Sequence, residues 1–308
     1  MKFNCNLCRK TTPHSLTISH WDNLYNVDKK VYEVWRCKEC GLEEISNKPE
    51  KNDMARYYSS NYYAYETETN IFFKIKKLIH SIKLSLPKNM SKGMLLNDLY
   101  VFATDGESRV LDIGCGDGHA LLELKDLGFE ELYGSEIDEK SKPRLEAKGI
   151  KALVTNDITK EKLPSDFDLV RLSHVLEHLY NPYETLQYSN ALLRNGGRIV
   201  IGVPNFDSPA RKLFKEYFCG LQLPTHLYHF TPTTLSKMLE INGFKIEKLK
   251  TTGFSGFSYS IVIFLRQKLS IKLPSIIETI FVVALSPMDI ILNVFGKGYI
   301  LVVEAKKE

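Results

Sequence analysis

The chain has 308 residues, of which 44% are hydrophobic and 25% charged, so we expect a globular protein with a large core, alone or with one small module. Its formal net charge is only +4, which argues against a general attraction to nucleic acid. The amino-terminal residues are polar and carry no signal-peptide pattern. We therefore expect a cytoplasmic protein whose six cysteines are metal ligands or free thiols, not disulfides.

Two pairs of cysteines near the amino terminus have the spacing of zinc ligands. Cys5 and Cys8 form one C-x-x-C pair, and Cys37 and Cys40 form the other. Four thiolates on two tight turns complete a tetrahedral Zn²⁺ site with no open position, so the zinc would be structural. Residues 1–53 are therefore predicted to form a zinc ribbon. This range has nine basic and eight acidic residues, a poor footprint for RNA.

Residues 54–100 are expected to form a linker or cap between this ribbon and the rest of the chain. Tyrosines cluster between residues 56 and 65. Residues 71–92 contain six lysines and no acid, with apolar residues on one helical face. Packing between modules explains both features. The alternative for the basic helix is a contact with anionic lipid or with a phosphorylated substrate.

A short apolar strand after residue 109 runs into a glycine loop and then into a helical pattern. The loop contains Gly114, Gly116 and Gly118 and is preceded by Asp112. Strand, glycine turn and helix in this order bring backbone N–H groups to a ligand at the carboxyl edge of an α/β sheet. A dinucleotide-binding fingerprint would need a glycine where His119 stands, so a different nucleoside-containing cofactor is indicated.

Two further strands end in acids after this loop. Glu136 closes the second strand and can accept both hydroxyls of a ribose, and Asp157 closes the third. The three signals together resemble class I S-adenosylmethionine (SAM) methyltransferases, and the resemblance implies that Asp157 contacts the adenine amino group. The cofactor-binding residues that it implies are Asp112, Gly114, Cys115, Gly116, Gly118, Glu136, Ile137, Asp157, Ile158 and Ser173.

Four later strands complete the fold that this resemblance implies. They are expected at residues 167–173, 198–203, 244–250 and 298–304. The predicted fold class is α/β, a Rossmann-like seven-stranded class I methyltransferase sheet with a small amino-terminal zinc ribbon. The SAM-binding domain would span residues 101–308.

Histidines gather at two places on the acceptor side of the predicted sheet. His174, Glu177 and His178 follow the fourth strand, whose carboxyl end faces the ligand crevice, and His226 and His229 lie in the segment H-L-Y-H-F-T-P. A hydroxyl acceptor needs a base as it attacks the methyl group, so these five residues are the catalytic candidates. Glu177 would orient a histidine or bind the acceptor. Dependence on a metal ion at this place stays open.

The H-L-Y-H-F-T-P segment, the cysteine pairs and the tyrosine cluster together resemble zinc-ribbon methyltransferases of sugar and cell-surface glycan biosynthesis. The resemblance implies, as the alternative to packing between modules, that the tyrosine cluster folds over the cofactor. The resemblance implies a small-molecule or glycan acceptor, such as the sugar hydroxyl of a nucleotide sugar or of a lipid-linked saccharide. Two alternatives stay open. One is an rRNA methyltransferase that binds RNA through the ribbon, and the other is a non-catalytic scaffold of the same fold.

Residues 254–296 form a strongly apolar insertion before the last strand. Glu278, Pro287 and Asp289 interrupt the apolar run, which argues against a membrane-spanning helix. We expect a helical lid or an in-plane helix pair that meets a membrane surface or a lipid-linked acceptor. Packing on the sheet and a homodimer interface are the alternatives.

Overall fold

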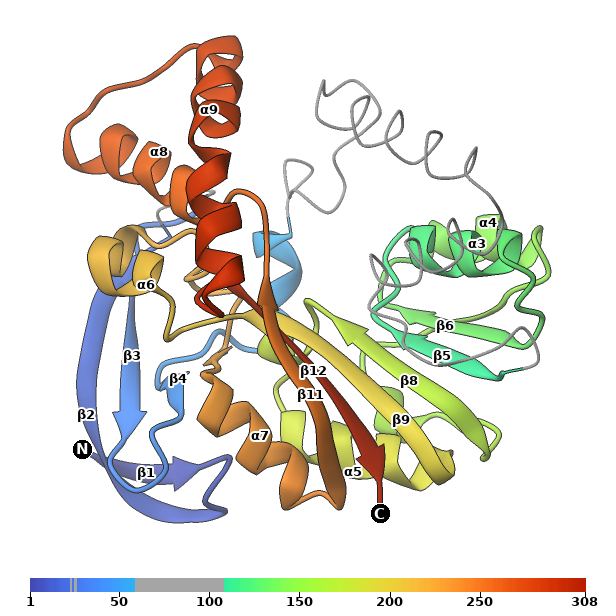
Figure 1. Ribbon diagram of the computed structural model, residues 1–308. Coiled ribbons are helices and arrows are strands. Elements are labelled where there is room, and N and C mark those ends of the chain that lie inside the picture. The colour runs from blue at the N-terminus through green and yellow to red at the C-terminus, as the bar shows by residue number, and fades with distance from the viewer. Residues whose placement is uncertain (23, 25–26, 59–107) are drawn as a thin grey trace.

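The computed structural model describes residues 1–22, 24, 27–58 and 108–308 (Figure 1). The predictions for the lysine-rich helix and for the tyrosine cluster beyond Tyr58 lie outside the described residues.

Seven strands form one mixed sheet in the order β11-β12-β9-β8-β5-β6-β7. Strands β5 to β9 pair in parallel, whereas β12 runs antiparallel to both of its neighbours. Helices and loops cover both faces, so central strands such as β5 are apolar and fully buried. This topology confirms the predicted Rossmann-like fold. The bounds are β5 (Val110–Ile113), β6 (Leu132–Glu136), β7 (Lys151–Val154), β8 (Phe167–Ser173), β9 (Leu193–Pro204), β11 (Phe244–Thr252) and β12 (Ile300–Lys307).

Short helices connect these strands and direct the loops at their carboxyl ends. Helix α7 shows the local logic best: Thr231 and Thr234 form a capping box, Pro232 fills the first turn, and Leu235 and Met238 are buried. The helices of this part are α3 (His119–Asp126), α4 (Ser141–Glu146), α5 (Pro182–Leu192), α6 (Pro209–Phe214) and α7 (Pro232–Glu240), with 3₁₀ turns η3 (Ile158–Lys160), η4 (Leu176–His178) and η5 (Lys215–Tyr217).

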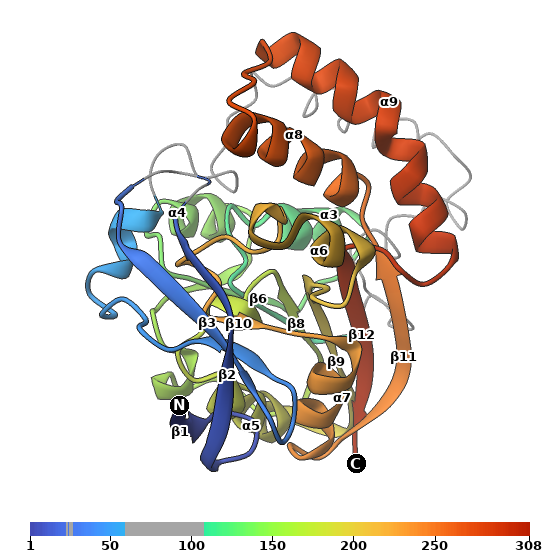
Figure 2. The same cartoon turned by 90° about the vertical axis from the view of Figure 1, so that its left-hand side faces the viewer.

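The amino-terminal part forms a second, antiparallel sheet in the order β1-β2-β3-β4-β10. Its strands are β1 (Lys2–Cys5), β2 (Lys10–Trp21), β3 (Val31–Cys37) and β4 (Glu43–Ile45), followed by the 3₁₀ turn η1 (Met54–Tyr57). The last strand, β10 (Tyr228–His229), which is labelled in Figure 2, comes from the H-L-Y-H-F-T-P segment and pairs with β4. One hydrophobic core includes side chains of both sheets, among them Val34 of β3 and Leu172 of β8. Strand pairing and a common core therefore join the predicted ribbon to the large sheet.

The apolar insertion folds into two helices, α8 (Gly256–Lys268) and α9 (Ser275–Val294), that project from the sheets (Figure 1). Glu278 forms an ion pair with Arg266 of α8 at 2.7 Å, and the buried Asp289 accepts hydrogen bonds from the N–H groups of Phe257 and Ser258. Because both acids bind within the helix pair, α9 continues through the interruptions that the sequence shows. It has 20 residues, and an 18-residue stretch of it has a mean hydropathy of 1.9, so α9 is the one helix in the described part whose length and composition would allow it to cross a membrane.

Candidate active site

The glycine loop lies between β5 and α3, and the surrounding side chains leave no room for larger residues. Gly114 and Gly118 have φ of +68° and +77°. A Cβ atom at Gly114 would collide with Val175, and one at Gly118 would collide with Leu145. Gly116 faces open space, so its backbone is free to approach a ligand. Cys115 is directed inward, with its Sγ against Gly134 of β6.

Asp112 is held under this loop by a residue that sequence reasoning missed. Arg171 donates from Nη1 to both carboxylate oxygens of Asp112 at 2.9 Å, and the two residues are register partners on β5 and β8. Burial raises the pKa of Asp112, and the Arg171 guanidinium opposes that rise. The pair therefore stabilises the end of β5. In the sequence Arg171 stands in a mainly apolar strand, but only the register of β5 and β8 pairs it with Asp112.

Glu136 is the last residue of β6, as predicted, but the third strand, β7, ends at Val154, and Asp157 instead caps the 3₁₀ turn η3. Glu136 accepts hydrogen bonds from the N–H groups of Gly116 and Ile137, both at 2.7 Å, which ties the end of β6 to the glycine loop. Asp157 accepts from Oγ1 of Thr159 at 2.7 Å and lies 3.9 Å from Nζ of Lys51. Burial raises the pKa of Asp157, but the Thr159 hydrogen bonds and Lys51 outweigh it and leave the pKa lowered.

The remaining predicted cofactor residues differ in their exposure. The side chain of Ile137 is 56% exposed beside Glu136, whereas Ile158 belongs to the hydrophobic core. Ser173 ends β8 and is half-buried. Ile137 and Ser173 can therefore contact a bound nucleoside, and Ile158 supports the loop from below.

Glu177, His178 and His226 bring their ligand atoms within 4.8 Å of one another. The first two lie on η4 and the third on the loop before β10. Glu177 is 1% exposed, and among the described residues neither of its oxygens receives a hydrogen bond. Nδ1 of His174 lies 3.5 Å from Oε1 of Glu177. Such a carboxylate is costly to bury unless a donor or a cation reaches it.

Backbone carbonyls determine how the two buried imidazoles are oriented. Nδ1 of His178 lies 2.9 Å from the carbonyl of Thr225, and Nδ1 of His226 lies 2.9 Å from that of Gly220. Each Nδ1–H donates to its carbonyl, which leaves Nε2 as an acceptor. Nε2 of His226 has no partner among the described residues. Burial lowers the pKa of both rings, well below the ordinary value for His226, so both are neutral bases.

His229, the fifth catalytic candidate, lies apart from this cluster. Its ring stacks on Phe206 with centroids 4.3 Å apart, and its backbone pairs with Glu43 in the second sheet. Burial, and then the charge of Arg211, lower the pKa of His229 to about 3. Its Nε2 atom, like that of His226, is buried without a hydrogen-bond partner among the described residues, but it is His174, Glu177, His178 and His226 that the structure brings together.

The cofactor loop and the histidine cluster are adjacent. Val175 packs against Gly114, and Glu177 follows two residues later. Tyr58, the last described residue of the tyrosine cluster, places its hydroxyl 3.1 Å from Nδ1 of His178. A molecule bound at the histidine cluster would thus lie next to a ligand bound at the glycine loop.

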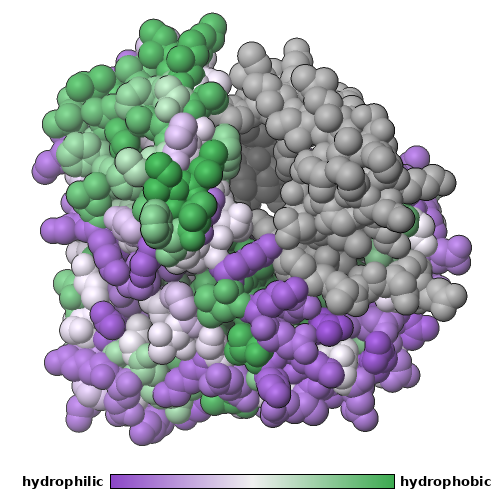
Figure 3. Space-filling view, in the orientation of Figure 1, coloured by the Kyte–Doolittle hydropathy of each residue, from purple (hydrophilic) through white to green (hydrophobic). Residues whose placement is uncertain are grey.

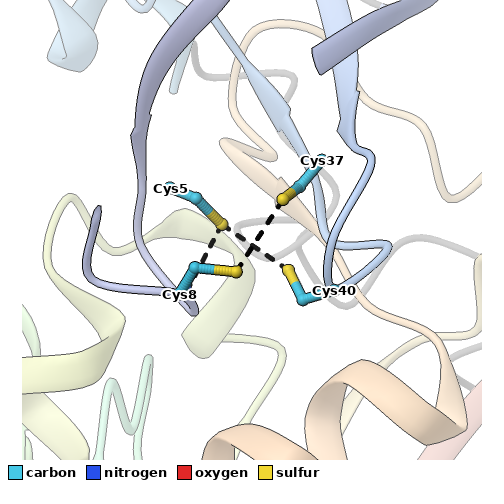
Figure 4. Close-up of side chains that lie close together, drawn as sticks. All are labelled: Cys5, Cys8, Cys37 and Cys40. Atoms are coloured by element: carbon cyan, nitrogen blue, oxygen red, sulfur yellow. Dashed lines mark hydrogen bonds between the residues drawn. The ribbon is translucent and has the colours of Figure 1, made fainter. Parts of the chain in front are cut away.

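The four amino-terminal cysteines converge at one point, as Figure 4 shows. Sγ of Cys5 lies 3.6 Å from that of Cys40, and Sγ of Cys8 lies 3.8 Å from that of Cys37. Four sulfurs at Zn–S bonds of about 2.3 Å and tetrahedral angles lie about 3.8 Å apart, so the thiols fit a zinc ion. The hydrogen bond from Cys40 lowers the pKa of Cys5 to about 5, and burial raises that of Cys8 to about 11.

Comparison with known proteins agrees with this geometry. A family model described as a methyltransferase domain matches residues 74–249. A ubiquinone biosynthesis O-methyltransferase of Bordetella bronchiseptica is 30% identical over 49% of this chain and 66% of its own length. An uncharacterised protein of Methanocaldococcus jannaschii is 25% identical over 64% of this chain and 83% of its own. Among solved structures, a complex of the Trm112 methyltransferase activator and a methyltransferase of Haloferax volcanii gives a TM-score of 0.50 at 15% identity, covering 68% of this chain and 86% of the other.

Proposed function

The chain belongs to the methyltransferase domain family and is a SAM-dependent methyltransferase, and from this premise we propose that its acceptor is a sugar hydroxyl. The sugar would be part of a nucleotide sugar or of a lipid-linked saccharide. One observation carries the proposal. Both carboxylate oxygens of Glu177 and Nε2 of His226 lie in one buried cluster beside the glycine loop, and none of these three acceptor atoms has a hydrogen-bond partner among the described residues. Several donors on one ligand, such as the hydroxyls of a sugar, would satisfy these three acceptors. A metal ion held by Glu177, His178 and His226 is the alternative.

The residues of the cluster can perform the proton transfer that an alcohol needs. SAM, when bound, supplies an electrophilic methyl group on sulfur. Nε2 of His226 would accept the proton of the acceptor hydroxyl, which makes its oxygen a better nucleophile toward that methyl group. Glu177 accepts a hydrogen bond from a neighbouring hydroxyl and fixes the sugar ring. The backbone carbonyl of Gly220 keeps His226 in the tautomer that this step requires.

Glu136 and the glycine loop are proposed to hold the cofactor. The carboxylate of Glu136 lies beside the backbone of Gly116, where it can accept the hydroxyls of a ribose. Asp157, which follows the next strand, is the proposed partner of the adenine amino group.

We further propose that the four cysteines hold a structural Zn²⁺ ion. The sulfur spacing supports this assignment. The ion would fix the turns before β2 and after β3, and with them β4, on which β10 and the loop of His226 depend. We propose a cytoplasmic enzyme that contacts the membrane surface, because a lipid-linked acceptor would be presented there.

The test combines cofactor binding with transfer of a labelled methyl group. Calorimetry should show SAM binding by the wild type, loss of binding in Glu136→Ala, and no change in Glu139→Ala, which removes a nearby exposed acid. Labelled SAM is then incubated with nucleotide sugars, lipid-linked saccharides and rRNA. Label in a sugar pool supports the proposal, whereas label in rRNA contradicts it. If the wild type did not bind SAM, both enzymatic functions would be excluded and the non-catalytic scaffold would be the remaining hypothesis.

A further inference from the structure

A cavity of about 490 Å³ lies between β2 and the segment of α6 and η5, away from the glycine loop. Its lining includes His20 on β2 and the basic residues Arg211, Lys212 and Lys215, against the single acid Glu216. Thr17 and Ser19 add hydroxyl groups. The cavity is large enough for a diphosphate group with part of a sugar, and its charge favours an anion.

Arg211 is a partly buried cation of this cavity, and the charges of Glu43 and Glu216 partly offset its own. Its Nε atom is buried without a hydrogen bond, and no carboxylate lies within ion-pair distance among the described residues. The guanidinium lies over the ring of Phe206, 4.3 Å from the centroid. Lys215 likewise has no ion pair within the described part of the chain, whereas Lys212 binds Asp207 at 2.7 Å. A planar guanidinium that has no ion pair and an Nε–H without an acceptor can donate two hydrogen bonds to the oxygens of one phosphate.

The cavity lies at the base of the apolar helix pair. His20 makes an edge contact with Tyr217 of η5, and Tyr217 makes one with Phe264 of α8. Phe214 of α6 packs in the same way against Phe257. Figures 1 and 2 both show α6 between β2 and α8. A ligand whose polar end fills the cavity can therefore extend along α8 and α9.

Helix α9 exposes far more apolar side chain than a monomeric soluble protein usually does. Its window of highest hydropathy is only 17% buried, and Figure 3 shows the apolar surface over this helix pair. Exposure reaches 73% at Ile276, 62% at Ile280 and 78% at Val294. Since Glu278 and Asp289 are bound within the pair, the unpaired charges nearby are basic, namely Lys268, Lys272 and Lys297. This combination fits an anionic membrane surface better than a second protein.

We propose that this cavity binds the phosphate or diphosphate of a lipid, while α8 and α9 lie in the membrane surface beside its chains. This inference rests on the proposed function and narrows the acceptor to a phosphate-linked lipid saccharide. Phe206 connects the two sites, because Arg211 lies over its ring and His229 stacks on it, three residues after His226. The phosphate would thereby anchor the lipid while its sugar reaches the histidine cluster.

Binding of inorganic diphosphate to the full-length protein tests the cavity. Calorimetry should detect binding by the wild type, and Arg211→Gln and Lys215→Gln should each weaken it by roughly tenfold or more, as expected for loss of a charged hydrogen bond. Lys237→Gln, on the exposed side of α7, is the matched control and should bind like the wild type. No binding by the wild type, or equal binding by Arg211→Gln, would overturn the assignment.

Flotation with vesicles tests the lipid. The wild type should float with vesicles of phosphatidylcholine and phosphatidylglycerol and much less with phosphatidylcholine alone. The double variant Ile280→Gln/Ile291→Gln should reduce flotation by roughly tenfold or more while diphosphate binding stays unchanged. Equal flotation of the variant, or none by the wild type, would contradict the lipid. A wild-type dimer that the variant converts to a monomer would assign the surface to a second copy instead.

SAM binding by the same proteins keeps this inference separate from the proposed function. All cavity and helix variants should bind SAM like the wild type, because none of them contacts the glycine loop. If the wild type binds SAM but neither diphosphate nor vesicles, only the lipid inference fails. If it binds vesicles and diphosphate but not SAM, the proposed methyl transfer fails and the lipid site stands.

Discussion

The cofactor side and the acceptor side of the site are built in different ways. On the cofactor side, the groups that meet lie on adjacent parallel strands close in the sequence, as the hydrogen bond from Gly116 to Glu136 shows. On the acceptor side, Glu177 and His178 meet His226 from a loop about fifty residues later. That loop leads into β10, which pairs with β4 of the amino-terminal sheet.

The difference predicts which perturbations each side tolerates. The cofactor side depends on one strand, one loop and the neighbouring strand, so distant changes should leave it intact. The acceptor side depends on the four cysteines, on β4 and on β10, because these hold the loop of His226 in place. Loss of the amino-terminal structure should therefore impair methyl transfer before it impairs SAM binding.

Cys40→Ser should have the largest effect and tests this division directly. Removal of one of four thiolates should abolish zinc binding and lower the free energy of unfolding by several kcal/mol, since a structural zinc contributes about 10 kcal/mol or more to folding of its site. Methyl transfer should be lost while SAM binding is retained. Metal analysis, thermal unfolding and calorimetry measure the three quantities.

The control for this change is Cys219→Ser, which alters a buried thiol outside the four. It should keep a full complement of zinc. Simultaneous loss of SAM binding in Cys40→Ser would show that the two sides are not independent and would break the comparison.

His226→Gln should have the next largest effect. The amide keeps a similar size but cannot accept the proton, so kcat should fall by about 10²- to 10⁴-fold, or roughly 3–5 kcal/mol. The dissociation constant for SAM should not change, because His226 lies on the acceptor side. His229→Gln, a matched change in the same segment, should lower kcat by less than about tenfold. Equal losses in both variants would exclude His226 as the specific base.

The large sheet could be predicted from the sequence because each strand is a local apolar run bounded by turn residues. Its parallel core needs no information from distant parts of the chain. The glycine loop and the acids after it were found for the same reason. The sequence did not reveal which residues far apart in the chain contact one another in the fold. Arg171 opposite Asp112 is an example, since it becomes visible only in the register of β5 and β8.

The roles of the two histidines in the H-L-Y-H-F-T-P segment could not be predicted for the same reason. His226 and His229 stand three residues apart in one polar segment, and nothing local distinguishes them. The pairing of β10 with β4 places His229 in a sheet, whereas the carbonyl of Gly220 orients His226 toward Glu177. A two-residue strand that pairs with residues some 180 positions earlier leaves no periodic pattern.

Acid should destabilise the acceptor side selectively, with an effect of intermediate size. His229 has a pKa of about 3 in the folded protein, from burial and Arg211, against an ordinary value near 6.5. The unfolded chain therefore takes up the proton first, so stability is complete above about pH 6.5 and declines as the pH falls toward 3. The loss should be about 2 kcal/mol at pH 5. Urea unfolding at pH 7 and pH 5 measures it, and His229→Gln should show a smaller difference.

Lys51→Ala should have the smallest effect and probes an ion pair by which the amino-terminal part reaches the cofactor side. Nζ of Lys51 lies 3.9 Å from Asp157, and its side chain is 44% exposed, so water and salt weaken the attraction. The affinity for SAM should change by no more than about threefold, or less than about 1 kcal/mol. Calorimetry at low and high salt would measure the change. Lys160→Ala is the control, because Nζ of Lys160 lies 3.5 Å from the same carboxylate but belongs to η3 and not to the amino-terminal part. If Lys51→Ala lost SAM binding and Lys160→Ala did not, the amino-terminal part would form part of the cofactor site. Asp157 would then depend on the amino-terminal part, and the two sides of the site would not be independent.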